Sequence, residues 1–353
     1  MVRSTGYAAH SSGALLEPFS FERRDPGDHD IVVGILYCGI CHSDLHYVED
    51  HKRNRRFPVI PGHEIVGVVN VVGSSVSKFR IGEVVAIGCM IDSCRVCNKC
   101  LGGRENMCVE RPTLTYGGFD RLSGRPNFGG YSNNYVIDEN YAIRVPESLD
   151  KACAAPLLCA GITVYSPLRR WKVGPGQRIG VVGLGGLGHI AVKMARAMGA
   201  EVAVFTSSLG KRDDALAFGA HQVVMSTDSA QRASLKGSLN FILDTVSAPH
   251  DLNTYLDLLQ PEATMCLLGV SPEPLSLSPM SIILGHKALV GSNIGGIAET
   301  QEMLDFCGRH LITAEIERLP LEQVNVAYER LRRNDVRYRF VIDMSKTGTN
   351  GAF

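Results

Sequence analysis

The sequence shows no excess of charge of either sign, because 36 lysine and arginine residues balance 36 aspartate and glutamate residues. General nucleic-acid binders carry a basic excess or a basic stripe, so this balance argues against that class of protein. Charged residues account for 20% of the chain and hydrophobic residues for 45%. These fractions are ordinary for a globular protein and exclude a disordered or fibrous one.

Long hydrophobic runs are also lacking. No apolar run approaches the ~20 residues that span a bilayer, and the first residues, Met1–His10, contain no apolar signal region. We therefore expect a cytoplasmic protein that has neither a membrane nor nucleic acid as a partner. Cysteine, with 11 residues, is too sparse for a secreted disulfide scaffold. In a reducing compartment, clustered cysteines bind metal more often than they bind each other.

The length of 353 residues predicts roughly two domains. The first part of the chain contains β-branched runs bounded by glycine and polar turns, which predict short strands in a barrel-like domain. These runs are Asp30–Tyr37, Glu64–Val72 and Glu83–Ile87. Farther on, expected strands alternate with helices, a pattern typical of a parallel, doubly wound sheet. These strands are Arg178–Val182, Val202–Phe205, Gln222–Met225, Phe241–Leu243 and Thr264–Leu268. After them, two helices are expected at Ala298–His310 and Leu321–Arg333, followed by a last strand at Arg339–Ile342.

Four cysteines follow the spacing Cys94-x2-Cys97-x2-Cys100-x7-Cys108. Four thiolates on short spacers fit a tetrahedral Zn²⁺ ion with no open position, so the motif predicts a structural zinc site. Four free surface thiols and an iron–sulfur cluster are the alternatives that the spacing leaves open.

A second candidate metal set, Cys41, His63 and Cys159, is dispersed along the chain. Two thiolates and one imidazole would hold zinc with a fourth position open, which is the catalytic pattern. Spacing alone is weak evidence here, and the apolar context of Cys159 equally fits a small core residue. The remaining cysteines are expected to be core residues: Cys38, Cys89, Cys153, Cys266 and Cys307.

A glycine-rich turn, GLGGLG, follows one expected strand and opens a helix. Gly183, Gly185 and Gly188 supply the GxGxxG pattern, with Gly186 and Leu187 between them. Such glycines allow a tight turn and the close approach of a dinucleotide pyrophosphate to the helix N-terminus. The alternative is a close helix–strand contact without a ligand.

An acidic residue is missing where the next strand ends. NAD-binding proteins place an aspartate or glutamate there to hold the ribose hydroxyls. This segment instead offers Ser207, Ser208, Lys211 and Arg212, whose hydroxyls and cations would bind a 2′-phosphate. We therefore predict NADP(H) as the cofactor. The alternative is a solvated helix start with exposed cations.

Together these motifs resemble the zinc-dependent medium-chain dehydrogenase/reductase superfamily, and most closely its cinnamyl alcohol dehydrogenase-like branch, which includes NADPH-dependent aldehyde reductases. The resemblance covers essentially the whole chain and rests on GHE-x2-G-x5-G, the four-cysteine motif, APLLCAGITVYSPL and GLGGLGH. It implies an α/β fold, with a GroES-like β-rich catalytic domain at residues 1–156 and 296–353 and a doubly wound Rossmann NADP-binding domain at 157–295. It also implies a homodimer joined through the Rossmann sheets.

The resemblance further implies the roles of individual residues. Cys41, His63 and Cys159 correspond to catalytic zinc ligands, so that the chain would bind two zinc ions, one catalytic and one structural. Glu64 corresponds to the acid that can approach the metal, and Asp44 to the carboxylate that orients the ligand histidine. Ser43 and His46 correspond to a proton relay. Thr163 and Arg339 lie in motifs that contact the cofactor.

The expected substrate pocket departs from that of the lignin-type members. Those enzymes carry a tryptophan at the position of Leu114, whereas the single tryptophan here is Trp171. An aromatic residue of those enzymes aligns near Asn293, and Tyr47 stands where glutamine is frequent. These differences argue against strict cinnamyl specificity. The basic run Lys52–Arg56 is expected to be a solvated loop, with contact to an anionic substrate or partner as the alternative.

The resulting prediction is a zinc- and NADP(H)-dependent alcohol dehydrogenase/aldehyde reductase. Its expected substrates are aromatic or medium aliphatic aldehydes and primary alcohols, converted by hydride transfer with a Ser-His proton relay. The alternatives are a conjugate C=C or iminium reductase on the same scaffold and a non-catalytic cofactor-binding protein. The intact ligands and relay residues argue against both.

Overall fold

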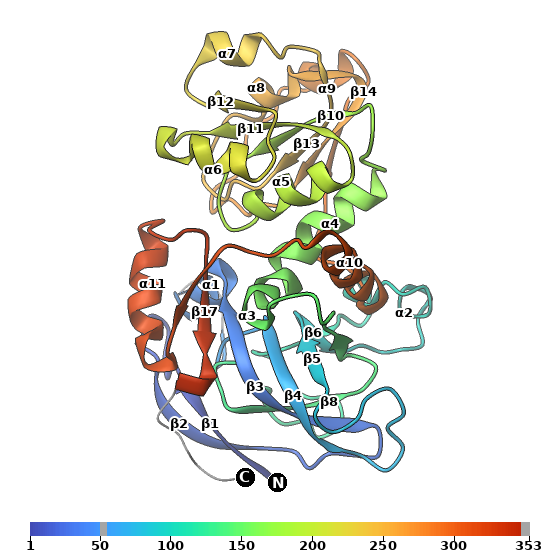
Figure 1. Ribbon diagram of the computed structural model, residues 1–353, viewed down its shortest axis with the longest axis vertical. Coiled ribbons are helices and arrows are strands. Elements are labelled where there is room, and N and C mark those ends of the chain that lie inside the picture. Colours follow the sequence, from blue (N-terminus) through green and yellow to red (C-terminus); the bar gives the residue numbers. More distant parts are fainter. Residues whose placement is uncertain (50–54, 347–353) are drawn as a thin grey trace. The chain divides into compact units, whose positions relative to one another are not determined.

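The computed structural model describes residues 1–49 and 55–346. The chain forms two compact units, Met1–Cys159 with Gly295–Phe353 and Ala160–Ile294 (Figure 1). Both ends of the chain therefore belong to one unit, and the other is continuous in sequence. The domain boundaries expected after residues 156 and 295 stay a prediction.

The first unit is built on a seven-stranded sheet in the order β16-β17-β3-β4-β5-β9, with β8 paired to β3. Its strands are β3 (Asp30–Ile40), β4 (Ile65–Val72), β5 (Val84–Ile87), β8 (Asn134–Asp138), β9 (Ile143–Arg144), β16 (Ile316–Leu319) and β17 (Arg339–Asp343). The C-terminal strand β17 pairs antiparallel with β3, so that Phe340 lies opposite Ile40. This pairing ties the two parts of the unit together.

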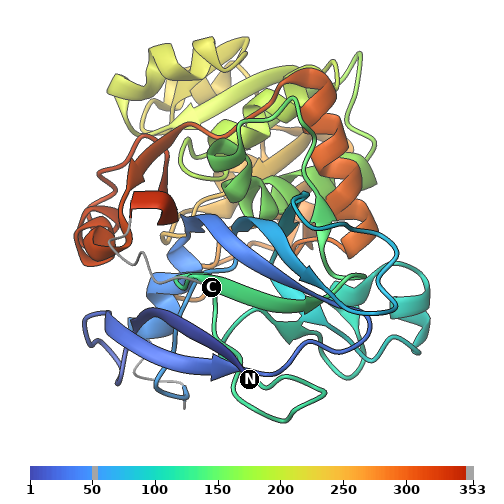
Figure 2. The ribbon, with the colours of Figure 1, turned by 60° about the horizontal axis from the view of Figure 1, so that its bottom comes forward.

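Smaller elements surround this sheet. Two short sheets pair β1 (Val2–Ala8) with β2 (Glu17–Arg23), and β6 (Met90–Asp92) with β7 (Thr113–Leu114). The helices are α1 (His42–Glu49), α2 (Asn98–Leu101), α3 (Lys151–Ala154), α10 (Ile297–His310) and α11 (Val324–Arg332), with 3-10 turns η1 (Glu105–Met107), η2 (Ala155–Leu158), η4 (Leu321–Gln323) and η5 (Met344–Lys346). The β1–β2 hairpin lies beside the larger sheet (Figure 2), and the Tyr7 N–H bonds to the Tyr131 carbonyl at 3.0 Å.

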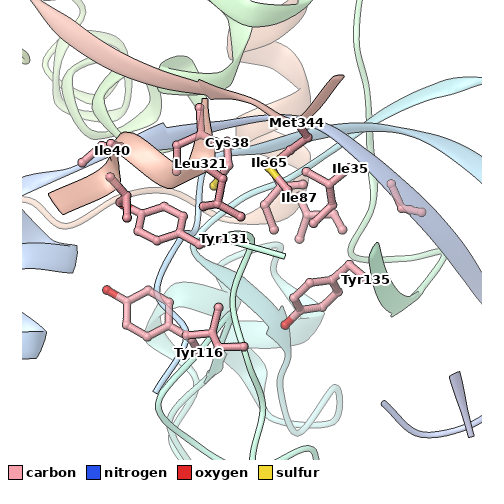
Figure 3. Close-up of a cluster of buried hydrophobic side chains, with 14 of the residues drawn as sticks. Ile35, Cys38, Ile40, Ile65, Ile87, Tyr116, Tyr131, Tyr135, Leu321 and Met344 are labelled. Atoms are coloured by element: carbon pink, nitrogen blue, oxygen red, sulfur yellow. The ribbon is translucent and has the colours of Figure 1, made fainter. Parts of the chain in front are cut away.

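The core of this unit contains several tyrosines beside aliphatic side chains. Tyr131 and Tyr135 are almost fully buried and lie in the same apolar cluster as Ile65 and Ile87 (Figure 3). Buried tyrosine hydroxyls need hydrogen-bond partners, because leaving them unpaired away from water is costly. The Tyr131 hydroxyl donates to Asp44 at 3.0 Å and the Tyr135 hydroxyl to the Thr115 carbonyl at 2.6 Å.

The second unit is a six-stranded sheet in the order β12-β11-β10-β13-β14-β15, in which every neighbouring pair is parallel. Its strands are β10 (Arg178–Val182), β11 (Glu201–Thr206), β12 (Gln222–Met225), β13 (Leu239–Asp244), β14 (Leu259–Leu267) and β15 (Ala288–Gly291). Its helical elements are α4 (Ala160–Arg170), α5 (Gly188–Ala197), η3 (Leu209–Lys211), α6 (Arg212–Ala217), α7 (Ser229–Ala233), α8 (Leu252–Leu256) and α9 (Met280–Ile283). The strand order reverses between β10 and β13, which is where doubly wound sheets bind ligands. The α/β fold class is confirmed.

The structure shifts the ends of several expected elements, and two of these shifts lie next to the site. The segment expected as one helix, Leu321–Arg333, begins with the 3-10 turn η4 before α11. The strand expected to begin at Glu64 begins at Ile65, although the Glu64 carbonyl still accepts the N–H of Gly39 in β3 at 2.9 Å.

Among residues 1–49 and 55–346, no single helix has the length and apolar composition to cross a membrane. One bent pair, Lys151–Leu158 with Ala160–Arg170, meets those two criteria only when its members are taken together.

Candidate functional site

Four metal-ligating side chains converge in the first unit. One ligand atom each from Cys41, His63, Glu64 and Cys159 lies within 4.8 Å of the others, and the two thiol sulfurs are 4.0 Å apart. Cys41 directly follows β3, and His63 precedes β4, so the antiparallel pairing of these strands brings both residues to one edge of the sheet. The three residues expected to bind catalytic zinc are thus together. Two sulfurs and an imidazole form a donor set that suits zinc.

Asp44 is hydrogen-bonded to two of these candidate metal ligands. Its carboxylate accepts hydrogen bonds from the Cys41 N–H (2.9 Å) and from His63 Nδ1 (3.0 Å). Because the carboxylate accepts, Nδ1 carries the hydrogen and Nε2 is left free for a metal. The bond to Cys41 is half of a capping box, with Cys41 as the residue before α1. Asp44 therefore positions two candidate ligands at once.

His63 is buried, and burial alone would lower its pKa. The adjacent Asp44 carboxylate outweighs this effect and raises the pKa of His63 well above its usual value. A metal must displace the proton that the imidazole then carries. Metal binding at this site should weaken as the pH falls.

Glu64 forms a buried ion pair with Arg339 of β17. Burial raises the pKa of Glu64 to about 7, against the opposing influence of Arg339. The second carboxylate oxygen of Glu64, Oε2, is buried and has no hydrogen-bond partner among the described residues. This oxygen is a spare donor beside the ligand set. The cofactor contact expected for Arg339 stays a prediction.

The expected relay residues lie on α1. Ser43 and His46 are both exposed, and their three-residue separation puts them on one face of the helix. The Ser43 hydroxyl is 3.5 Å from Cys41 Sγ, which brings it to the edge of the ligand set. The role of Ser43 and His46 as a proton relay stays a prediction.

The three expected pocket residues have different environments. Tyr47 is half-buried, and its hydroxyl donates to the Gly117 carbonyl at 3.2 Å. Leu114 of β7 is 51% exposed. Asn293 follows β15 in the second unit. Their role in substrate binding stays a prediction.

The basic run lies partly outside the described residues, which omit 50–54. Arg55 is half-buried, with its guanidinium 4.3 Å from the centre of the Tyr47 ring. Arg56 is exposed and lies 4.2 Å from the centre of the Phe119 ring. The expectation of a solvated loop is therefore wrong for Arg55, whose cation packs on an aromatic face.

The four-cysteine lobe, residues 94–108, forms a separate cluster. One sulfur atom each from Cys94, Cys97, Cys100 and Cys108 lies within 4.8 Å of the others. Backbone N–H groups of Cys94 and Cys97 point at cysteine sulfurs at 3.4 Å, an arrangement that stabilises thiolates. Four sulfurs without another donor suit a closed zinc site. The lobe also holds α10, since Glu105 Oε2 accepts the Ile297 N–H at 3.1 Å.

The glycine-rich turn lies at the carboxyl end of β10, as expected. Gly183 has φ +91°, a conformation that favours glycine. A Cβ atom on Gly188 would lie 2.0 Å from the Gly183 carbonyl oxygen, whereas a Cβ on Gly185 would meet nothing within 4 Å. The turn therefore packs tightly on one side and is open at Gly185. An open backbone at a helix N-terminus fits a pyrophosphate.

The residues expected to bind the 2′-phosphate follow β11. Ser207 and Arg212 are exposed, whereas Ser208 and Lys211 are half-buried. Lys211 Nζ donates to the Leu184 carbonyl of the glycine-rich turn at 3.0 Å. Lys211 thus also holds the turn, a role that sequence reasoning missed. Thr163, expected to contact the cofactor, lies half-buried in α4.

His189 is a second residue that sequence reasoning missed. It is fully buried in α5, and its Nδ1 donates to the Gly185 carbonyl at 3.0 Å. The only signal in the sequence was a histidine within an apolar helix directly after the glycine motif.

The glycines of the turn provide a prediction with an internal control. Gly188→Ala is expected to lower Tm by several degrees, because overpacking against backbone costs ~1–3 kcal/mol, and also to weaken NADPH binding. Gly185→Ala is expected to leave Tm unchanged and to weaken NADPH binding, because the methyl group would occupy the open face. Thermal melts and NADPH fluorescence titration measure both effects. Equal Tm losses in the two variants would contradict this description of the turn.

Comparison with known proteins places these sites in a family. The family model "Alcohol dehydrogenase GroES-like domain" matches residues 27–147, and "Zinc-binding dehydrogenase" matches residues 186–309. The chain is 48% identical over 339 residues to NADP-dependent alcohol dehydrogenase C of Mycobacterium bovis, covering 96% of this chain and 98% of the relative.

Two solved structures extend the similarity to the fold. A cinnamyl alcohol dehydrogenase from Sorghum bicolor superposes with a TM-score of 0.95 at 46% identity, over 99% of this chain and 100% of the other. The CAD of Helicobacter pylori, complexed with NADP(H), superposes with a TM-score of 0.92 at 42% identity, over 98% and 99%. The predicted resemblance is confirmed: the chain belongs to the zinc-dependent medium-chain dehydrogenase/reductase family of alcohol dehydrogenases, in its cinnamyl alcohol dehydrogenase-like branch.

Proposed function

We propose that this protein is a zinc- and NADP(H)-dependent alcohol dehydrogenase/aldehyde reductase that acts on aromatic or medium aliphatic aldehydes and primary alcohols. The observation that carries the proposal is the convergence of Cys41, His63 and Cys159 within 4.8 Å, together with the spare carboxylate of Glu64. Zinc held there would act as a Lewis acid on the substrate oxygen, while NADPH would supply the hydride.

The chain's own residues perform the remaining tasks. Asp44 fixes the imidazole of His63 through a 3.0 Å hydrogen bond. The exposed hydroxyl of Ser43 exchanges a proton with the substrate oxygen, and His46, one turn farther along the same face of α1, exchanges it with solvent. In aldehyde reduction the proton moves from His46 through Ser43 to the new alcohol, and in alcohol oxidation it moves in the opposite direction.

A second zinc, bound by Cys94, Cys97, Cys100 and Cys108, would have a structural role, since four sulfurs leave no position for a substrate. The cofactor would lie with its pyrophosphate at the glycine-rich turn and its 2′-phosphate near Ser207, Ser208 and Arg212.

We also propose a cytoplasmic homodimer. Strand β15 is the last in the six-stranded sheet and has one strand neighbour among the described residues. The unpaired backbone N–H and C=O groups of an edge strand can pair with a strand of another chain. The nearby helix α9 exposes Met280 and Ile283, by 51% and 62%. A second copy of the chain would cover both features.

The direct test is NADPH consumption with a panel of aldehydes, run beside zinc quantitation and product analysis. We expect oxidation of NADPH, alcohol products and two zinc ions per chain. Absence of turnover by zinc-replete protein across the panel would overturn the proposal. Products with a saturated C=C bond and an intact carbonyl group would point to a conjugate-bond reductase.

The proton relay makes a separate prediction. Ser43→Ala is expected to lower kcat for aldehyde reduction by ~10²–10⁴-fold, the usual contribution of a positioned proton donor. The zinc content of this variant should be unchanged, because Ser43 is not one of the candidate zinc ligands. Ser43→Thr, which keeps a hydroxyl at the same position, is the matched control and should retain most activity. Wild-type kcat in Ser43→Ala would exclude the relay.

A further inference from the structure

Tyr131 is connected to the metal site by a hydrogen bond to Asp44. We propose that Tyr131 is a positioning residue, whose hydroxyl fixes the Asp44 carboxylate and thereby the metal-binding orientation of His63. The inference rests on the proposed function only in taking Cys41, His63 and Cys159 as metal ligands.

The hydrogen bonds at Asp44 carry the argument. Tyr131 donates its hydroxyl to Asp44 Oδ2 at 3.0 Å, and the Cys41 N–H donates to the same oxygen at 2.9 Å. The other oxygen, Oδ1, accepts from the Gly62 N–H and from His63 Nδ1, both at 3.0 Å. Asp44 is 0% exposed, so these donors stand in for water around its carboxylate. The positions of these four donors determine the orientation of the Asp44 carboxylate.

Tyr131 is itself held in place at three points. Its N–H donates to the Pro61 carbonyl at 3.0 Å, and its carbonyl accepts the Tyr7 N–H at 3.0 Å. Its ring lies against Gly62, where a Cβ atom would be 2.7 Å from Tyr131 Cδ1 and where φ is +103°. The Pro61–Gly62 segment, which precedes His63, is thus in close contact with the Tyr131 residue that orients Asp44.

The phenol remains a donor under ordinary conditions. Burial, and next the Asp44 carboxylate, raise the pKa of Tyr131 well above its usual value. The ring is fully buried in the apolar cluster of Figure 3, where no competing solvent reaches it. The Tyr328 side chain is also within hydrogen-bonding reach of Tyr131, but only the Asp44 carboxylate is a charged acceptor, and the bond to it forms without a metal.

Removing this hydroxyl leaves Asp44 Oδ2 with one fewer donor. The carboxylate can then rotate toward its remaining donors, and the bond that directs His63 loses its fixed geometry. Partners that orient a metal ligand from behind typically contribute ~10–100-fold to metal affinity. We expect Tyr131→Phe to weaken zinc binding at the Cys41–His63–Cys159 set by about 10-fold, with zinc in the four-cysteine lobe unaffected.

The chain offers a matched control in Tyr135. It is 1% exposed and lies in the same cluster, and its hydroxyl donates to the Thr115 carbonyl at 2.6 Å. Tyr135→Phe removes an equally buried hydrogen bond that does not involve Asp44. It should lower Tm without changing zinc affinity at the catalytic set.

The experiment measures zinc dissociation constants by chelator competition, and the visible spectrum of the Co²⁺-substituted protein. The Tyr131→Phe variant should show weaker binding and a shifted Co²⁺ spectrum, whereas Tyr135→Phe should match the wild type in both. Identical affinities and spectra in the two variants would overturn the proposal. Neither measurement depends on turnover. A wild-type protein that binds zinc tightly but is inactive would therefore contradict the proposed function without contradicting this inference.

A double-mutant cycle tests whether Tyr131 acts through Asp44, even where a variant is less stable. Tyr131→Phe should change zinc affinity in the wild-type background and have little further effect in the Asp44→Asn background. Additive losses would show that Tyr131 affects the metal by another route and would overturn the assignment.

Discussion

Replacing Cys159 with alanine is expected to lower kcat by at least ~10³-fold and to reduce bound zinc from two ions per chain to one. The reason is that Cys159 supplies one of only two sulfurs in the catalytic set, 4.0 Å from Cys41 Sγ. Without Cys159 the remaining donors are Cys41, His63 and the Glu64 carboxylate, which is already paired with Arg339, so zinc should bind much more weakly. The four-cysteine lobe shares no ligand with this set, so its zinc should stay bound.

Metal analysis together with steady-state kinetics checks this expectation. Cys307→Ala is a suitable control, because Cys307 is fully buried and its thiol contacts Met303 instead of either cysteine cluster. The control should lose some thermal stability and keep both metals and its activity. Full activity in Cys159→Ala would remove Cys159 from the site. Loss of both zinc ions would instead show that the two clusters are not independent.

Arg212→Ala is expected to raise the KM for NADPH by about 10–100-fold and to leave the KM for NADH nearly unchanged. A hydrogen bond to a charged group contributes ~1.5–3 kcal/mol, and only NADPH carries the 2′-phosphate. Arg212 is exposed at the start of α6. Its cation is therefore available to a ligand.

Lys211→Ala should behave differently from Arg212→Ala. Lys211 Nζ also holds the Leu184 carbonyl of the glycine-rich turn, so its loss should raise the KM for both cofactors, and more for NADPH. Initial rates with each cofactor measure the effects, and Lys236→Ala, which removes an exposed cation elsewhere in the same unit, serves as the control. An equal change of both KM values in Arg212→Ala would overturn the 2′-phosphate assignment.

Local signals in the sequence predicted the strands of the second unit well. Strands β10 and β12 occupy the residues expected, since short β-branched runs between turn residues carry their own signal. Helix α1 was not predicted, because HSDLHYVE lacks a clear apolar stripe. Its start is instead stabilised by the Asp44 carboxylate, a tertiary feature of the metal site.

The candidate site could be predicted in part. Spacing identified the four-cysteine lobe, and the resemblance to a family supplied Cys41, His63 and Cys159. The pairs Glu64–Arg339 and Asp44–Tyr131 could not be predicted, because their members are far apart in sequence and no motif links one member of a pair to the other. These contacts depend on the pairing of β17 with β3 and on where the loop before β8 lies.

The pairing of β17 with β3 has a consequence for the order in which the protein is made. Residues 160–294 leave the ribosome as one continuous stretch and can fold before synthesis ends. The first unit cannot complete its sheet until β17 emerges, and until then Glu64 lacks its Arg339 partner. Between the synthesis of Cys159 and the synthesis of β17, the nascent chain therefore contains all its candidate metal ligands but lacks the strand that carries Arg339. Translation that stops before residue 339 should yield a folded second unit beside an incomplete first one.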